Sequence, residues 1–158
     1  MPARKKDRHG PNARIGILTS LDQDGVTRQG VRFRVAAFRF RPEQQVTLQL
    51  EQYHAKKWGS FVRIDWRSRP HTNKSVPNSP LHLTTAAESH IHALEDNSLL
   101  GWPEILASSP DLPLAKTIDG VDCYADLLAF AAKAFGIDNL DKLEAPPWEA
   151  LLTSHLRL

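Results

Sequence analysis

Residues 31–66 read VRFRVAAFRFRPEQQVTLQLEQYHAKKWGSFVRIDW, and this stretch decides the fold. Apolar and polar residues alternate three times along it and through the residue that follows it, over 31–35, 46–51 and 62–67. Strict alternation is typical of a half-buried strand, because successive side chains point to opposite faces of a sheet. The links between these segments are short, and short links join antiparallel neighbours. The stretch therefore predicts an antiparallel sheet.

The sheet extends beyond this stretch on both sides. Residues 13–19 have strand character, and residues 21–25 (LDQDG) carry a turn signal. The apolar positions are odd through Val35 but even at Phe38 and Phe40, and a bulge near residues 36–37 would absorb this change of phase. Residues 90–94 alternate again and are expected to return to the sheet. We expect four to six strands from residues 13–94, by the density of strand signals.

Helical spacing replaces alternation after Asn97. Asp119 is a suitable N-cap, and Gly136 can end the same helix in a left-handed conformation. A short terminal helix is expected to begin near Pro147. The sequence thus predicts an α+β fold, in which an antiparallel sheet from the N-terminal half is packed by C-terminal helices. We expect residues 13–158 to form a single domain and residues 1–12 to form a disordered basic arm.

Composition excludes several classes of protein. The single cysteine, Cys123, cannot form an internal disulfide, which argues against a secreted disulfide scaffold. No apolar run approaches the ~20 residues that cross a membrane, and no hydrophobic stretch follows the basic N-terminus. The chain also lacks phosphate-binding glycine motifs and C-x-x-C. We expect a cytoplasmic protein that uses no cofactor and contacts no membrane.

Charge is distributed unevenly along the chain. The net charge is +2, but residues 1–75 carry 16 basic and 6 acidic residues, a net of +10, whereas the remainder carries −8. A basic half can bind RNA or another polyanion. The two halves could instead neutralise each other by packing together. If the basic half binds nucleic acid, its contacts are expected on an exposed patch of Arg32, Arg34, Arg39 and Arg41.

Histidine, arginine, asparagine and aspartate gather between Arg63 and Asn97, and this is the candidate site. In a strand, Arg63, Asp65 and Arg67 share one face, and so do the two imidazoles of an H-x-H pair. If the two strands are neighbours, a loop can bring further polar residues to the same region. The site would then contain Arg63, Arg67, His71, Asn73, His90 and His92.

Three chemistries would use such a set. In metal-free phosphodiester cleavage, His71, His90 and His92 would serve as acid and base, Arg63 and Arg67 would bind the phosphate, and Asn73 would orient them. A metal ion could bind the H-x-H pair, with His71 or His82 as a third ligand, although we assign no metal. The arginines could bind an anion without catalysis. A purely structural cluster is equally compatible with the pattern, because H-x-H is a weak motif.

The pattern also resembles known sequences. Arg63-x-Asp65, Pro70-His71-x-Asn73 and His90-x-His92, with a tail like residues 130–152, resemble an uncharacterised family of small bacterial and phage-borne proteins. More loosely, the chain is similar to the TumE-type toxins of toxin–antitoxin pairs, which carry clustered histidines after an arginine-rich strand. The resemblance covers about residues 30–152 and implies a mobile-element or host–phage conflict setting.

Two hypotheses about function follow. The first is a toxin-like RNA-directed protein with a metal-independent ribonuclease site. The second is a non-enzymatic interaction protein, such as a phage-encoded inhibitor or an antitoxin-like partner, that binds nucleic acid or an acidic protein surface. Geometry separates them: histidines that converge in a cleft beside Arg63 favour catalysis, whereas scattered histidines favour interaction. The sequence gives no oligomeric state.

Overall fold

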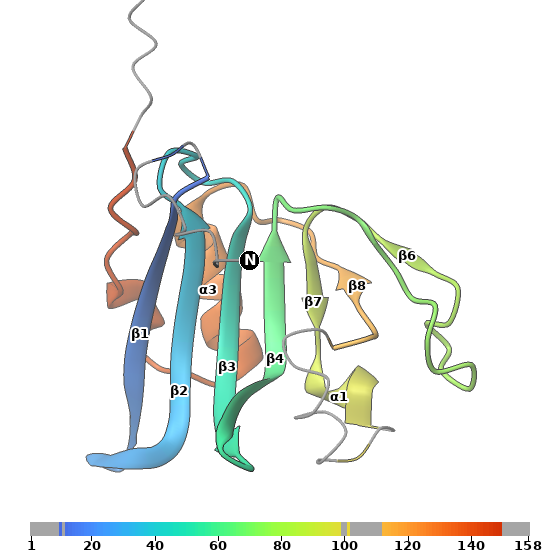
Figure 1. Cartoon of the computed structure of the whole chain (residues 1–158), viewed down its shortest axis with the longest axis horizontal. Coiled ribbons are helices and arrows are strands. Elements are labelled where there is room, and N and C mark those ends of the chain that lie inside the picture. Colours follow the sequence, from blue (N-terminus) through green and yellow to red (C-terminus); the bar gives the residue numbers. More distant parts are fainter. Residues whose placement is uncertain (1–9, 11, 99–100, 102–111, 150–158) are drawn as a thin grey trace, which may run out of the picture.

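Six antiparallel strands form the main sheet of the computed structural model, which describes residues 10, 12–98, 101 and 112–149 (Figure 1). Their order across the sheet is β1-β2-β3-β4-β7-β8, and each is antiparallel to its neighbours. Their bounds are β1 Arg14–Gln23, β2 Val26–Phe38, β3 Val46–His54, β4 Lys57–Trp66, β7 His90–His92 and β8 Lys116–Thr117. The α+β prediction is confirmed, although β8 comes from beyond Asn97.

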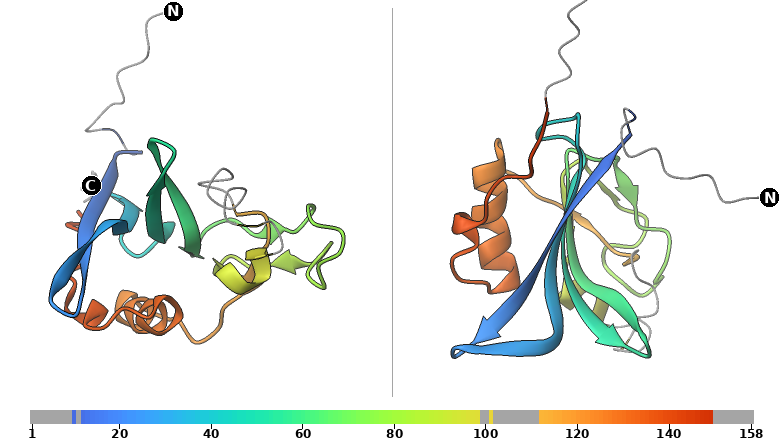
Figure 2. Two further views of the ribbon diagram at one scale, coloured as in Figure 1. Left: turned by 90° about the horizontal axis from the view of Figure 1, so that it is seen from below. Right: turned by 60° about the vertical axis from the view of Figure 1, so that its left-hand side comes forward.

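The two faces of the sheet differ in chemistry because alternate residues face opposite ways. One face is apolar: Val46, Leu48 and Ile64 are fully buried there and belong to the hydrophobic core. Helix α3, Tyr124–Phe135, covers this face (Figure 2) and contributes Leu127 to the core. The opposite face of the central strands carries charged and polar residues, and it positions the candidate site.

Helix α3 begins later than the sequence indicates. Its N-cap is Cys123 rather than Asp119, and the Asp126 carboxylate accepts hydrogen bonds from the backbone N–H groups of Asp122 and Cys123. A carboxylate in the first turn satisfies N–H groups that have no partner within the helix. Gly136 ends the helix at φ 65°, as expected for a left-handed C-cap.

Strand β2 contains no bulge near residues 36–37, so this prediction is wrong. Phe33, Val35 and Ala37 are all buried on the apolar face, and the pairing with β1 continues without interruption to Phe38. Phe38 breaks the alternation because its ring lies beneath two guanidinium groups, those of Arg14 at 4.5 Å and Arg41 at 4.8 Å. Cation–π contacts stabilise an aromatic side chain outside the core.

A smaller hairpin and a connecting segment flank the sheet beside β7 and β8. Strands β5, His71–Thr72, and β6, Thr85–Ala86, form a separate two-stranded sheet. The short helix α1, Leu94–Asn97, follows β7, and the 3₁₀ helix η2, Leu140–Lys142, follows α3. The described part of the C-terminal segment, through Glu149, contains no helix at Pro147, and residues 150–158 lie outside the described residues.

The basic arm, residues 1–12, lies almost entirely outside the described residues. Among the helices that the structure describes, none has the length and apolar character that crossing a membrane requires.

Candidate phosphate-binding and catalytic site

Strands β4 and β7 bring four of the candidate side chains together. The register pairs Arg63 with His92 and Asp65 with His90. Residues directly opposite each other in an antiparallel pair carry their side chains on the same face, so all four lie on the polar face of the sheet. The H-x-H pattern and the R-x-D pattern therefore meet as two adjacent cross-strand pairs.

The Asp65 carboxylate is the centre of this cluster, which we call the Asp65 cluster. Its Oδ1 accepts a hydrogen bond from Thr47 Oγ1 at 2.8 Å, and its Oδ2 accepts one from Arg63 Nε at 2.8 Å. The Nε2 atoms of His90 and His92 lie 3.5 and 3.4 Å from Oδ2. Burial alone would raise the pKa of Asp65, but the neighbouring imidazoles of His90 and His92, the Arg63 charge and the Thr47 hydrogen bond together hold it well below its usual value.

His92 is neutral at physiological pH. Burial, assisted by the charge of Arg63, lowers its pKa from 6.5 to about 4, although Asp65 opposes the shift. Arg63 Nη2 lies 2.9 Å from His92 Nε2, and a guanidinium can only donate. Nε2 is therefore the acceptor and the proton resides on Nδ1, which is buried and has no hydrogen-bond partner among the described protein atoms.

His90 is oriented differently and reaches the solvent-facing cleft. Its Nδ1 donates to the backbone carbonyl of Ala87 at 2.7 Å, so Nε2 is the atom at which it gains or loses a proton. Nε2 faces the Asp65 carboxylate at 3.5 Å. An imidazole fixed by a carbonyl on one side and facing a carboxylate on the other is well placed to exchange a proton.

His71 joins the other two histidines from strand β5. Its ring centroid lies 4.9 Å from that of His92 and 5.9 Å from that of His90. The Nε2–H group donates to the backbone carbonyl of Pro113 at 2.9 Å, which leaves Nδ1 as the exchanging nitrogen. The structure thus brings His71, His90 and His92 together.

Asn73 supports this arrangement from a distance. It is fully buried, and its side-chain amide both donates to the Ala115 carbonyl and accepts from the Ala115 N–H, each at 2.8 Å. These bonds fix the segment that contains Pro113, whose carbonyl receives the His71 hydrogen bond. Asn73 therefore orients His71 through the backbone and does not itself contact the cluster.

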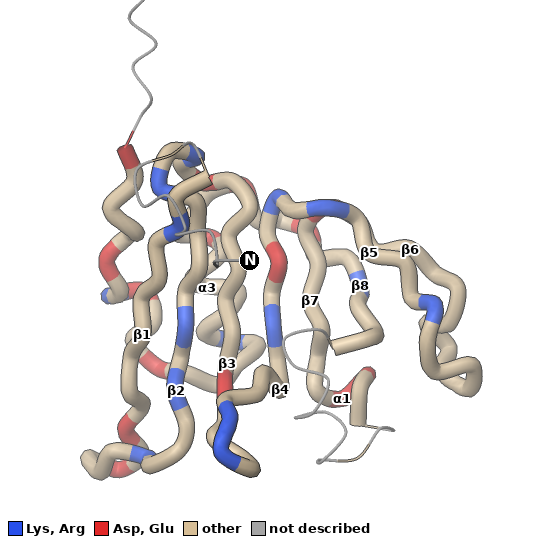
Figure 3. The backbone as a smooth tube through the Cα atoms, viewed as in Figure 1, with Lys and Arg blue, Asp and Glu red and all other residues tan. Residues whose placement is uncertain are grey.

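A second carboxylate, Glu51, organises two arginines next to the Asp65 cluster. Its Oε2 lies 2.6 Å from Arg32 Nε, and its Oε1 lies 3.5 Å from Arg34 Nη1. Gln49 donates to Oε1 at 3.2 Å. Glu51 is only 3% exposed, so the two guanidinium groups are held in place by a buried charge. The basic residues of β2 and β4 accordingly lie on the two strands that flank β3, which carries Glu51 (Figure 3).

An open cleft of about 700 Å³ connects both groups of residues. Five arginines and two acidic residues line it, an excess of three positive charges. The lining includes Arg14, Arg32, Arg34, Arg63, Arg69, Glu51, Asp65, Trp58, His71 and His90. A concave surface with a net positive charge attracts and concentrates anions.

Three of the predicted arginines lie elsewhere. Arg67 adopts φ 49° just after β4, so it does not continue the strand alternation, and it donates instead to the carbonyls of Glu43 and Asp122. Arg39 forms an ion pair with Glu149, and Arg41 donates to Asn12 and Gln45. The expected patch of four arginines is thus divided: Arg32 and Arg34 line the cleft, whereas Arg39 and Arg41 are not among its lining residues.

The cluster offers three potential metal ligands. One donor atom each from Asp65, His90 and His92 lies within 4.8 Å of the others. The Arg63 guanidinium, however, donates to both Asp65 Oδ2 and His92 Nε2, so a cation would have to displace it from two of the three ligand atoms. His82, the alternative third ligand, lies near the Ser75 carbonyl instead. The residues do not fit a metal ion while Arg63 holds this position.

Comparison with known proteins gave no relatives. No protein-family model, curated protein or solved structure matched the chain.

Proposed function

We propose that the chain is an RNA-directed, toxin-like protein that cleaves RNA without a metal ion. The observation that carries this proposal is that His71 and His90 both line one arginine-rich cleft, each with one ring nitrogen fixed by a backbone carbonyl. Two imidazoles in a positively charged cleft provide a base, an acid and a phosphate-binding environment.

The reaction assigns a separate role to each residue. One of His71 and His90 removes the proton from a ribose 2′-hydroxyl, whose oxygen then forms a bond to phosphorus. The other donates a proton to the 5′-oxygen as its bond to phosphorus breaks. Arg63 stabilises the charge that develops on the phosphoryl oxygens. His92, being neutral and buried, acts as a positioning residue that accepts a hydrogen bond from Arg63.

RNA is the substrate that this chemistry requires. In a metal-free cleavage the substrate can supply its own nucleophile, because the ribose 2′-hydroxyl lies next to the phosphate and a histidine base can deprotonate it. DNA lacks this group, so it would bind in the cleft without being cleaved. The arginines of the Glu51 group would contact neighbouring phosphates and make binding sensitive to salt.

A test of this function compares purified variants on RNA in the presence of a chelator. We expect His71→Ala and His90→Ala to lose ~10²-fold or more in cleavage rate, the usual scale for a general acid or base. His82→Ala is the matched control, because it removes a histidine that lies outside the cleft. Chelator-resistant activity supports the proposal, whereas activity that disappears with the chelator indicates a metal enzyme.

The toxin setting has its own test. Expression of the wild-type chain should arrest bacterial growth, and the His90→Ala variant should not. Wild-type protein that never cleaves RNA, with or without divalent metal, would refute the enzyme. If the same protein binds RNA or an acidic protein, the non-enzymatic interaction function stands instead.

A further inference from the structure

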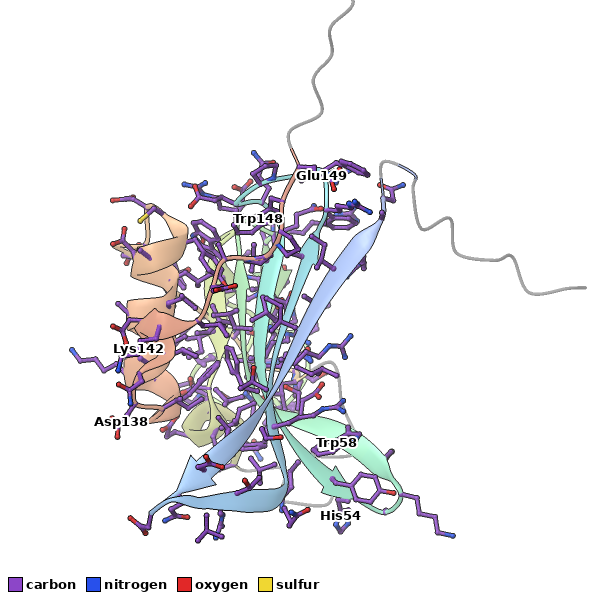
Figure 4. The ribbon with its side chains drawn as sticks, turned by 90° about the vertical axis from the view of Figure 1, so that its left-hand side faces the viewer. His54, Trp58, Asp138, Lys142, Trp148 and Glu149 are labelled. Atoms are coloured by element: carbon purple, nitrogen blue, oxygen red, sulfur yellow. The ribbon has the colours of Figure 1, made fainter. Side chains whose placement is uncertain are left out.

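The β3–β4 hairpin carries a pair of aromatic residues at its tip. Ala55 and Lys56 adopt φ of 48° and 64°, which makes a tight two-residue turn whose twist matches that of the strands. The turn places Tyr53 opposite Trp58, with ring centroids 5.4 Å apart and ring planes at 56°. Tyr53 remains 50% exposed. Figure 4 shows Trp58 and His54 at this tip, on the side of the sheet away from α3.

Trp58 is connected to the cleft through Arg32. The Arg32 guanidinium lies 3.9 Å from the centroid of the Trp58 ring, and the buried carboxylate of Glu51 holds it there. Trp58 and Arg32 both line the cleft that contains His71 and His90. The aromatic pair thus extends the same cleft away from the reactive histidines. Asp65 follows Trp58 by seven positions along β4, roughly 23 Å at ~3.3 Å per residue.

These residue types bind unpaired nucleobases. Aromatic rings and the flat guanidinium of arginine both stack on the faces of bases, whatever the base. Lys56 and Lys57 are exposed beside the rings and supply charges for the adjoining phosphates. The faces of bases in a duplex are covered by their neighbours, so a stacking surface of this kind selects single strands.

We propose that Tyr53, together with the Trp58–Arg32 layer, is a subsite that stacks one or more bases of single-stranded RNA. The inference rests on the proposed function and adds the substrate class. A strand bound in the cleft would have its scissile phosphate near His71 and His90 and a base several nucleotides away on Tyr53. A duplex would contact the arginines through its phosphates but would not use Tyr53.

The test measures binding of an RNA that cannot be cleaved because its 2′-hydroxyls are methylated. One position carries 2-aminopurine, whose fluorescence is quenched when the base stacks. We expect Tyr53→Leu, which keeps an apolar side chain but removes the ring, to weaken binding about 5- to 150-fold, the range that corresponds to one lost stacking contact. It should also abolish the quenching. Tyr53→Phe retains the ring and should retain both the affinity and the quenching. Leu83→Ala changes an exposed apolar residue outside the cleft and controls for the loss of apolar surface.

The possible outcomes distinguish failure of the proposed stacking subsite from failure of the proposed RNA-directed function. If the wild type does not bind the RNA at low salt, both proposals are overturned. If the wild type binds and Tyr53→Leu binds equally well with full quenching, only the subsite is overturned. Duplex RNA provides a second comparison: its affinity should be the same for wild type and Tyr53→Leu, and an equal loss on duplex and single strand would refute base stacking.

Discussion

Acidification should destabilise the protein through His92 before any carboxylate of the cluster titrates. Burial and the Arg63 charge lower the pKa of His92 from 6.5 to about 4, so the folded state resists binding a proton that the unfolded state accepts. At about 1.4 kcal/mol per tenfold difference, this lowering corresponds to roughly 3 kcal/mol of stability lost on full acidification. A loss of this size is a large share of a typical domain's stability.

The direction and the pH window follow from the two pKa values. Above about pH 6.5, His92 is neutral in both states and contributes no pH dependence. Between about pH 6.5 and 4, the unfolded chain becomes protonated first, so stability falls as the pH falls. Asp65 remains ionised throughout this window, because its pKa is held well below the usual value. Stability that Asp65 provides is lost only at still lower pH.

Urea unfolding at several pH values measures this effect directly. The His92→Gln variant keeps a side-chain oxygen that can accept from Arg63 but removes the titrating ring. We expect the wild type to lose roughly 3 kcal/mol more than His92→Gln between pH 7 and 4. His82→Gln, which alters an imidazole outside the cluster, should follow the wild-type curve. Equal pH dependence in wild type and His92→Gln would refute the neutral, desolvated state of His92.

Three further predictions concern single contacts. Asn73→Ala leaves the N–H and carbonyl of Ala115 without their partners and should cost about 2–6 kcal/mol in urea unfolding, at 1–3 kcal/mol for each of the two groups. A loss below about 0.5 kcal/mol would contradict this. Arg67→Ala should leave RNA cleavage within about twofold of wild type, whereas Arg63→Ala should lower it ~10²-fold, the scale for removing a charge-stabilising donor. Gly136→Ala should destabilise the fold by about 1 kcal/mol because φ is 65° there, and an unchanged melting temperature would argue against the left-handed cap.

The sheet was largely predictable because alternation reports strands directly. The alternation over 46–51 and 62–67 anticipates β3 and β4, and the same logic places Arg63 and Asp65 on one face and His90 with His92 on another strand. Pairing β4 with β7 then follows only if the 23 residues between them form a separate unit, as the β5–β6 hairpin does. The sequence contains no direct signal for that arrangement. It therefore predicts that the R-x-D and H-x-H patterns lie side by side only on the condition that β4 and β7 are neighbours.

Backbone conformation explains one failed prediction, that for Arg67, and cation–π contacts explain another, the bulge in β2. Arg67 continues the alternation in the sequence, but its positive φ turns the chain away from the strand, and nothing in the residue type predicts this. The apolar pattern of β2 changes phase at Phe38 because this aromatic ring lies on the polar face, where cation–π contacts stabilise it. Hydrophobic periodicity assumes that large apolar residues mark the core, and a ring covered by guanidinium groups violates that assumption.

The role of Glu51 was missed for a related reason. An acidic residue at a polar position of an alternating strand is usually solvent-exposed, and its burial here depends on arginines from a neighbouring strand. The register supplies a usable signal: β2 and β3 are joined by a short link, so Arg32 and Arg34 fall opposite Glu51 and Gln49. Counting cross-strand charge pairs would have identified the second carboxylate.

The two buried carboxylates explain how the polar face can hold its arginines in place without a ligand. A guanidinium on the surface loses side-chain entropy when it binds a phosphate, whereas Arg32 and Arg63 are already fixed by Glu51 and Asp65. Glu51 binds Arg32 through Nε, one of the five N–H donors that a guanidinium carries. Removing either carboxylate would therefore have two separable effects. The fold would lose stability, by about 3–5 kcal/mol where the buried Arg63 loses Asp65 and by less where Arg32, whose side chain is 23% exposed, loses Glu51. The remaining arginine would also bind phosphate more weakly, although the net charge of the cleft had become more positive. A surface that attracts RNA only through its net charge would show the opposite effect, because each acidic residue removed would tighten binding. The affinity of Glu51→Gln for RNA therefore distinguishes the two cases. Weaker binding than wild type indicates a preorganised site, and tighter binding indicates a surface that is merely basic.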